Sequence, residues 1–90
     1  MFNNAPGGLN MAYTLHRLPK VLNTTGESRS NLYLKIQKGL FTKPVPIGAR
    51  AVAWPAEEIK LINAARIAGK SERDIRALVT RLEAKRQACI

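Results

Sequence analysis

The stretch PKVLNTTGESRSNLYLKIQKG, residues 19–39, decides the fold, because it is typical of two short helices joined by a tight turn. Pro19 suits the start of a helix, since its φ angle is already fixed and it has no amide hydrogen to leave unbonded. Gly26 suits the left-handed conformation that ends a helix. Ser28 is the predicted N-cap of the second helix, residues 29–38. Two short helices around a glycine-containing turn indicate a helix-turn-helix.

The residues that follow predict a β-hairpin. Residues 40–54 contain too many prolines for a helix, and Gly48-Ala49 provides a turn. Apolar residues alternate on both sides of that turn, at Val45, Ile47, Val52 and Trp54. The alternation predicts one apolar face, with Trp54 in the core and Arg50 at a basic tip. A hairpin directly after a recognition helix is a wing.

Two further helices are expected. The third begins at Pro55 and ends at Gly69, and the fourth runs from Ser71 to about Gln87. Residues Tyr13–Leu18 form a short strand or an extended lead-in. The predicted fold class is therefore mainly α with a small β-hairpin, a winged helix-turn-helix plus a C-terminal helix.

The chain is long enough for one domain. We expect a disordered N-terminal tail at residues 1–12, a winged helix-turn-helix domain at residues 13–69 and an amphipathic helix at residues 70–90. The sequence does not decide whether residues 1–10 are native.

The fourth helix has an apolar seam with i, i+3, i+4, i+7 spacing, formed by Ile75, Leu78, Val79 and Leu82. The seam either folds back on its own domain or pairs with the same helix of a second copy. We favour pairing, since the seam exceeds what a minimal winged domain needs.

The charge is concentrated in the first half. The net charge is +9 over 90 residues. Residues 16–50 hold seven cations and one anion, Glu27, whereas residues 51–90 hold eight cations and five anions. A polyanion is the commonest partner of such a surface, and nucleic acid is the commonest polyanion.

Other function classes lack candidate residues. No apolar run reaches the length of a membrane span, and the opening residues do not resemble a signal peptide. His16 has no neighbouring metal ligands, and Cys89 has no intrachain disulfide partner. We therefore expect no enzyme activity, no cofactor, no metal and no membrane partner, and a cytoplasmic, nucleoid-associated location in a bacterium. The scarcity of aromatic residues disfavours single-strand binding and favours duplex DNA.

Three motifs carry a family resemblance. They are LPKVLNTTGESRSNLY at residues 18–33, GLFTKPV at residues 39–45 and GARAVAW at residues 48–54. Together they resemble the AlpA-type phage regulatory proteins, small winged helix-turn-helix proteins of the MerR-like and excisionase-like group found on prophages and integrative elements. The match covers roughly Leu18 to Ala68. Glu27 departs from the small apolar residue usual in the turn, and the helix after Ser71 extends past the minimal domain.

The candidate DNA contacts follow from the position of the second helix, whose N-terminal side chains would reach base edges in the major groove. The recognition-helix candidates are Ser28, Arg29, Ser30, Asn31, Tyr33, Lys35 and Lys38. The candidates on the wing and its flanks are Lys20, Lys43 and Arg50.

Alternatives stay open for several of these side chains. Arg29 pairs with a guanine or contacts a phosphate, and Asn31 pairs with an adenine or serves the helix end. Tyr33 either contacts a phosphate, which we favour, or covers the edge of the core. Lys35 and Lys38, like Lys43, are expected to contact the DNA backbone.

The resemblance implies control of integrase or excision genes, or direct assistance in excision. We therefore expect a sequence-specific double-stranded DNA-binding transcriptional regulator of a prophage or integrative element. One alternative is an excisionase-like directionality factor that bends attachment-site DNA. A second is a protein-interaction module, such as an anti-repressor, that binds no DNA. The partners considered are duplex DNA, a second copy in a homodimer or DNA-assembled oligomer, integrase and RNA polymerase.

Overall fold

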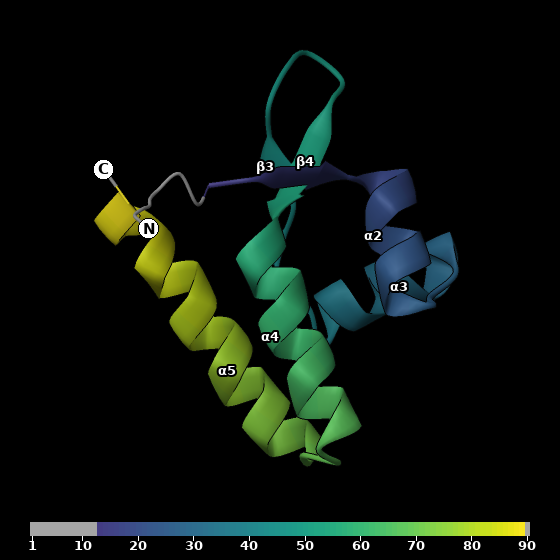
Figure 1. The fold of residues 1–90 in the computed structure, drawn as a ribbon, viewed down its shortest axis with the longest axis vertical. Helices are drawn as coiled ribbons and strands as arrows, with labels where there is room; N and C mark the ends of the chain where they lie inside the picture. The colour runs from purple at the N-terminus through teal and green to yellow at the C-terminus, as the bar shows by residue number, and fades with distance from the viewer. Residues whose placement is uncertain (1–12, 90) are drawn as a thin grey trace, which may run out of the picture.

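The computed structural model describes residues 13–89, in which the helices lie to one side of a small sheet whose β3–β4 end projects away from them (Figure 1). The predicted tail at residues 1–12 lies outside the described residues. In chain order the elements are β2 (Leu15–Arg17), α2 (Leu18–Thr25), α3 (Arg29–Gln37), β3 (Val45–Pro46), β4 (Val52–Pro55), α4 (Ala56–Ile67), α5 (Glu72–Lys85) and a 3-10 turn, η2 (Arg86–Cys89). The prediction of a mainly helical fold with a small sheet is confirmed, and the arrangement is compatible with a winged helix-turn-helix.

The sheet has three antiparallel strands in the order β2-β4-β3. Leu15 of β2 lies opposite Pro55 of β4, and Val45 of β3 lies opposite Ala53. The segment before the first helix is thus a strand, the first of the two forms considered for it. It makes β4 the central strand, and the loop between β3 and β4 projects beyond the sheet (Figure 1).

The prediction of a single apolar hairpin face was wrong by one residue. The Ile47 amide donates to the Ala51 carbonyl at 2.9 Å, so three residues, 48–50, form the loop instead of a two-residue turn. A one-residue change in register moves side chains to the opposite face of a strand. Val45 therefore pairs with Ala53, and its side chain lies on the face of the sheet opposite to Val52 and Trp54. Strand β4 is buried on both faces, through Ala53 on one and Trp54 on the other.

The helix ends agree with the predictions to within one or two residues. Ser28 Oγ accepts the Asn31 amide at 3.2 Å, which confirms the predicted N-cap of α3. Ser71 Oγ caps α5 in the same way and accepts the Asp74 amide at 3.1 Å. The helix was predicted to begin at Pro55, but α4 begins at Ala56 and Pro55 is its N-cap. Pro55 still belongs to β4, whose pairing with β2 keeps it extended.

One hydrophobic core joins all the helices to the sheet. The prediction that Trp54 is a core residue is confirmed, since it is fully buried and its indole N–H donates to the Thr42 carbonyl at 2.9 Å. Phe41 meets the Trp54 ring edge-on, with ring centroids 6.3 Å apart. Leu32 brings α3 to this core, and Ile62 brings α4.

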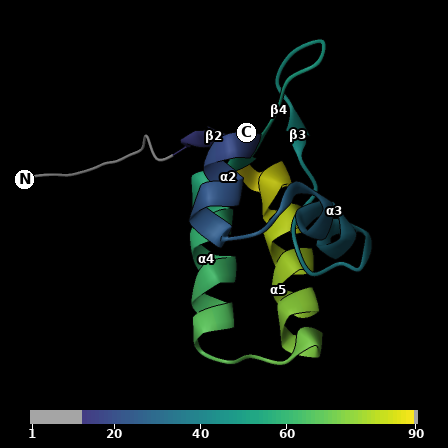
Figure 2. The ribbon, with the colours of Figure 1, turned by 90° about the vertical axis from the view of Figure 1, so that its right-hand side faces the viewer.

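The expectation that the α5 seam pairs with a second copy requires correction. Ile75, Val79 and Leu82 are buried in the core of their own domain, and Leu78 is half-buried against it. Helices α4 and α5 run side by side, joined by a short turn (Figures 1 and 2). The seam therefore completes the core shared with residues 13–69, and a dimer through these side chains would have to open that core.

A buried ion pair fixes the end of α5. Arg86 donates from Nε and Nη2 to both carboxylate oxygens of Glu58 at 2.8 and 2.7 Å, and the Glu58 side chain is only 6% exposed. The hydrogen bond to Glu58 raises the pKa of Arg86, although burial opposes the shift. Local sequence patterns do not reveal this contact, because the two residues are 28 positions apart.

We expect Arg86→Met to lower the free energy of unfolding by about 3 kcal/mol, since it leaves the buried Glu58 carboxylate without its partner. Urea titration of wild-type and variant protein measures the change. Arg73→Met, at an exposed position on α5, is the matched control and should change stability by less than about 0.5 kcal/mol. Equal stability of the two variants would contradict the role of the pair.

Candidate nucleic-acid interface

The outer face of α3 is continuous and polar apart from one residue. Its exposed side chains are Arg29, Ser30, Asn31, Leu34, Gln37 and Lys38. Leu34 lies four residues after Ser30 and four before Lys38, so it is at the centre of this face, 47% exposed. Leu34 and Gln37 were not among the predicted contacts, although their spacing from the buried Leu32 could have identified both.

Two predicted contacts have other partners in the structure. Tyr33 is half-buried and packs against the core, which is the alternative that was not favoured. Lys35 was expected to contact the DNA backbone, but its ammonium group forms an ion pair with Glu27. Ser28 caps the helix while remaining exposed, so its hydroxyl lies at the same end of α3 as Arg29 and Ser30.

Glu27 links three parts of the domain. Its carboxylate pairs with Lys35 of α3 and lies 3.2 Å from Nη2 of Arg66 on α4. The Glu27 side chain is only 8% exposed. The one acidic residue of the basic half is therefore neutralised inside the fold and does not present a negative charge beside α3.

Side chains of α4 also donate hydrogen bonds to the backbone just before the turn. Asn63 Nδ2 donates to the Thr24 carbonyl at 3.0 Å, and Arg66 Nη1 donates to the Thr25 carbonyl at 3.1 Å. These carbonyls lie at the end of α2, where helix geometry leaves them without partners. Together with the Glu27 contacts, they fix the point at which the chain enters α3.

The wing carries one basic and one apolar side chain at its exposed end. Arg50 lies in the loop between β3 and β4, where it was predicted, and is exposed. Ile47, at the base of that loop, is 43% exposed. Lys20 on α2 and Lys43 before β3 are exposed as well. The predicted cations thus lie on α2, on α3, on the wing and on the segment before β3. Figures 1 and 2 show the wing projecting above α2 and α3.

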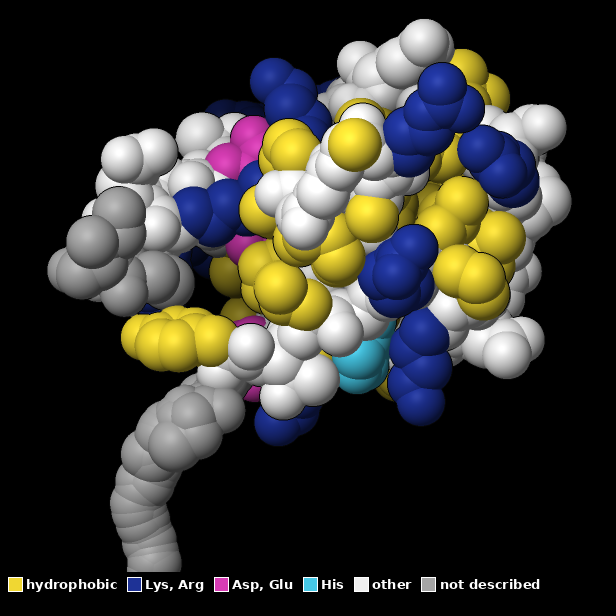
Figure 3. Space-filling model, turned by 90° about the horizontal axis from the view of Figure 1, so that it is seen from above, with side chains coloured by type: hydrophobic (Ala, Val, Ile, Leu, Met, Phe, Trp, Pro, Cys, Tyr) yellow, Lys and Arg dark blue, Asp and Glu magenta, His cyan; other side chains and the backbone are white. Residues whose placement is uncertain are grey.

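The charges are unevenly placed when the molecule is viewed from the wing side. In Figure 3, dark-blue Lys and Arg side chains surround apolar ones on the right, the side of α2 and α3. The acidic side chains visible in this view lie on the left, the side of α5. Long-range attraction of a polyanion would therefore favour approach from the side of α2 and α3.

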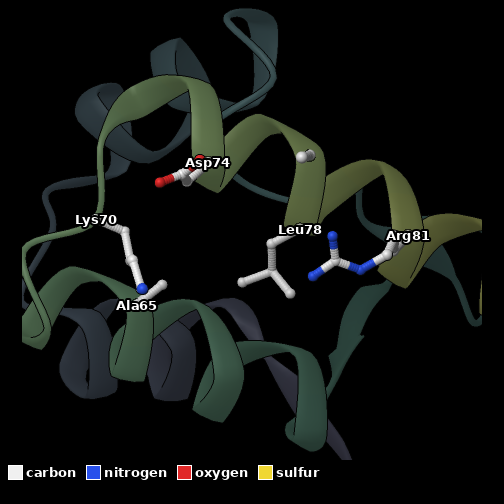
Figure 4. A pocket seen from close by; sticks show the side chains of 6 residues that line it. Ala65, Lys70, Asp74, Leu78 and Arg81 are labelled. Carbon is white, nitrogen blue, oxygen red and sulfur yellow. The ribbon is translucent and has the colours of Figure 1, made fainter.

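The surface formed by residues 13–89 has open hollows lined by a mixture of polar and apolar side chains. Figure 4 shows an open depression between α4 and α5, into which Leu78 projects beside Lys70 and Arg81. Among residues 13–89 no three His, Cys, Asp or Glu side chains gather closely enough to hold a metal ion. No helix in the same range is long and apolar enough to cross a membrane. The half-buried His16 has an Nδ1 atom without a hydrogen-bond partner, and it belongs to no such group of three among the described residues.

Comparison with known proteins identifies the family. The family model of the prophage CP4-57 regulatory protein, AlpA, matches residues 14–61, which is more than half of the chain. An uncharacterized protein of Enterobacteria phage P4, ORF88, is 43% identical over 54 residues, which are 60% of this chain and 61% of that protein. The matched region thus spans less than two thirds of the relative's length. No solved structure gives a significant match. On the family match, the chain belongs to the AlpA family of prophage regulatory proteins.

Proposed function

We propose that this protein is a sequence-specific duplex DNA-binding regulator of a prophage or integrative element that controls integrase or excision genes. The observation that carries the proposal is the exposed polar face of α3 beside a basic wing, in a member of a regulatory family of phage origin. An α-helix fits the major groove, and the side chains at its N-terminal end reach base edges.

Several exposed residues have a specific role within this proposal. Arg29 pairs with a guanine edge or a phosphate, while Ser30 and Asn31 lie one and two positions further along the same helix end. Leu34 packs against a thymine methyl group, the apolar feature of the major groove. Arg50 enters the adjacent minor groove or meets its phosphates. Lys20, Lys38 and Lys43 contact the DNA backbone and add affinity without sequence preference.

The protein acts in the bacterial cytoplasm and needs no cofactor for this function. An excision role differs from a promoter role in where the protein binds, and the position of the site distinguishes the two. The interaction-module alternative would dock through the apolar seam of α5, and it loses part of its basis because Ile75 of that seam is a core residue. Integrase or RNA polymerase would have to contact another surface.

Fluorescence anisotropy at about 150 mM salt, near physiological ionic strength, tests the proposal. Tiled duplexes should cover the protein's own promoter and the neighbouring integrase and attachment regions, with random duplex as the reference. We expect one tile to bind at least ~1,000-fold more tightly than random duplex, as specific regulators do. Arg29→Ala should reduce affinity for that tile by about 1–3 kcal/mol. Equal, salt-sensitive binding to every tile would contradict sequence-specific regulation.

Lys35 and Lys38 should respond differently to the same substitution. Lys38→Met removes an exposed cation, so it should weaken binding to all duplexes and reduce the salt slope by about 1. Lys35→Met also removes a partner of the buried Glu27 carboxylate, so it should lower the free energy of unfolding by about 1 kcal/mol. Urea titration and salt-dependent anisotropy measure the two effects. A stability loss for Lys38→Met that equals that of Lys35→Met would be inconsistent with the Glu27 contact.

A further inference from the structure

The segment between α3 and the wing, residues 38–43, is hydrogen-bonded at both ends to side chains of α5 and its C-cap. At its start, Arg76 Nε donates to the Lys38 carbonyl at 2.8 Å. At its end, the Lys43 amide donates to Glu83 Oε2 at 2.9 Å, and Arg86 Nη2 donates to the Lys43 carbonyl at 2.7 Å. Lys38 is the C-cap of α3, and Lys43 lies two residues before β3.

The spacing of the gripping residues matches the helix. Arg76 and Glu83 are seven residues apart, so they lie on one face of α5, next to the buried Ile75, Val79 and Leu82. Arg86 follows three residues after Glu83 and is itself anchored by Glu58. The side chains of α5 thus have a fixed base from which to hold the segment.

We propose that Arg76, Glu83 and Arg86 form a clasp that fixes α3 relative to the wing, and that they are positioning residues for DNA recognition. This inference rests on the proposed function. If the helix and the wing contact the same duplex, both must fit it at once, so freedom between them must be lost on binding. A clasp that removes this freedom in advance raises affinity for the specific site.

Substitutions of Glu83 can distinguish a positioning role from direct DNA contact, because the two roles predict opposite changes in DNA affinity. A carboxylate is repelled by phosphates, so removing its charge should strengthen non-specific DNA binding or leave it unchanged. If the clasp positions α3 and the wing, removing the acceptor should nevertheless weaken binding to the specific site. Glu83→Ala removes both charge and acceptor, whereas Glu83→Gln removes the charge but keeps an oxygen that accepts the Lys43 amide.

The first test measures the affinities of both variants for the tightest-binding tile and for random duplex. We expect Glu83→Ala to bind the tile about tenfold more weakly than wild type, and Glu83→Gln to stay within about threefold. Neither variant should lose affinity for random duplex. Glu57→Ala, at an exposed position on α4, controls for the charge change. Equal tile affinity for the two Glu83 variants would overturn the proposal.

The second test needs no DNA and so distinguishes failure of the clasp from failure of the proposed function. Spin labels are attached through Ser30→Cys on α3 and Ala49→Cys on the wing, with Cys89→Ser to avoid a third label. Pulsed electron paramagnetic resonance then gives the distance distribution between them. Glu83→Ala should broaden the distribution, and Glu83→Gln should restore the wild-type width. An unchanged width in Glu83→Ala overturns the clasp, whether or not the wild-type protein binds one tile specifically.

Discussion

The arrangement of the basic half of the chain, residues 16–50, depends on the ion pairs that the Glu27 carboxylate forms with Lys35 and Arg66. This carboxylate is the one acidic group between residues 16 and 50, and it lies buried between Lys35 of α3 and Arg66 of α4. A buried carboxylate needs charged or hydrogen-bonding partners, because its desolvation is otherwise costly. The pairing therefore couples the turn, the recognition helix and α4. It also leaves the outer face of α3 without a negative charge.

The other helices extend the same principle. Helix α4 binds the backbone at the entry to α3 through Asn63 and Arg66, and α5 binds the backbone at its exit through Arg76. Side chains that would be free cations on an isolated helix thus hold carbonyl groups of the helix-turn-helix. The positive charge of the second half of the chain is partly structural, whereas that of α2, α3 and the wing faces outward except at Lys35, which pairs with Glu27.

Sequence patterns predicted the elements well, because their signals are local. Ser28 and Ser71 act as caps within three residues of their partners. The loop length of the hairpin could not be predicted, because β4 is buried on both faces and its apolar residues do not mark one side. The burial of the α5 seam in its own domain could not be predicted either, since an apolar stripe has the same pattern whether it packs on its own domain or on a second copy. The Glu58–Arg86 pair depends on tertiary contact across 28 positions. Among the candidate site residues, those at the helix start and wing tip are exposed as expected, while Tyr33 and Lys35 are tied to the fold.

The central claim is that the outer face of α3 and the wing together meet duplex DNA. The most direct measurement is a titration of isotopically labelled protein with the tightest-binding duplex, followed by backbone amide chemical shifts in nuclear magnetic resonance. The account predicts the largest changes in residues 28–38 and 47–51, with small changes on the outer side of α5. Changes confined to residues 70–81, with α3 and the wing unaffected, would contradict it.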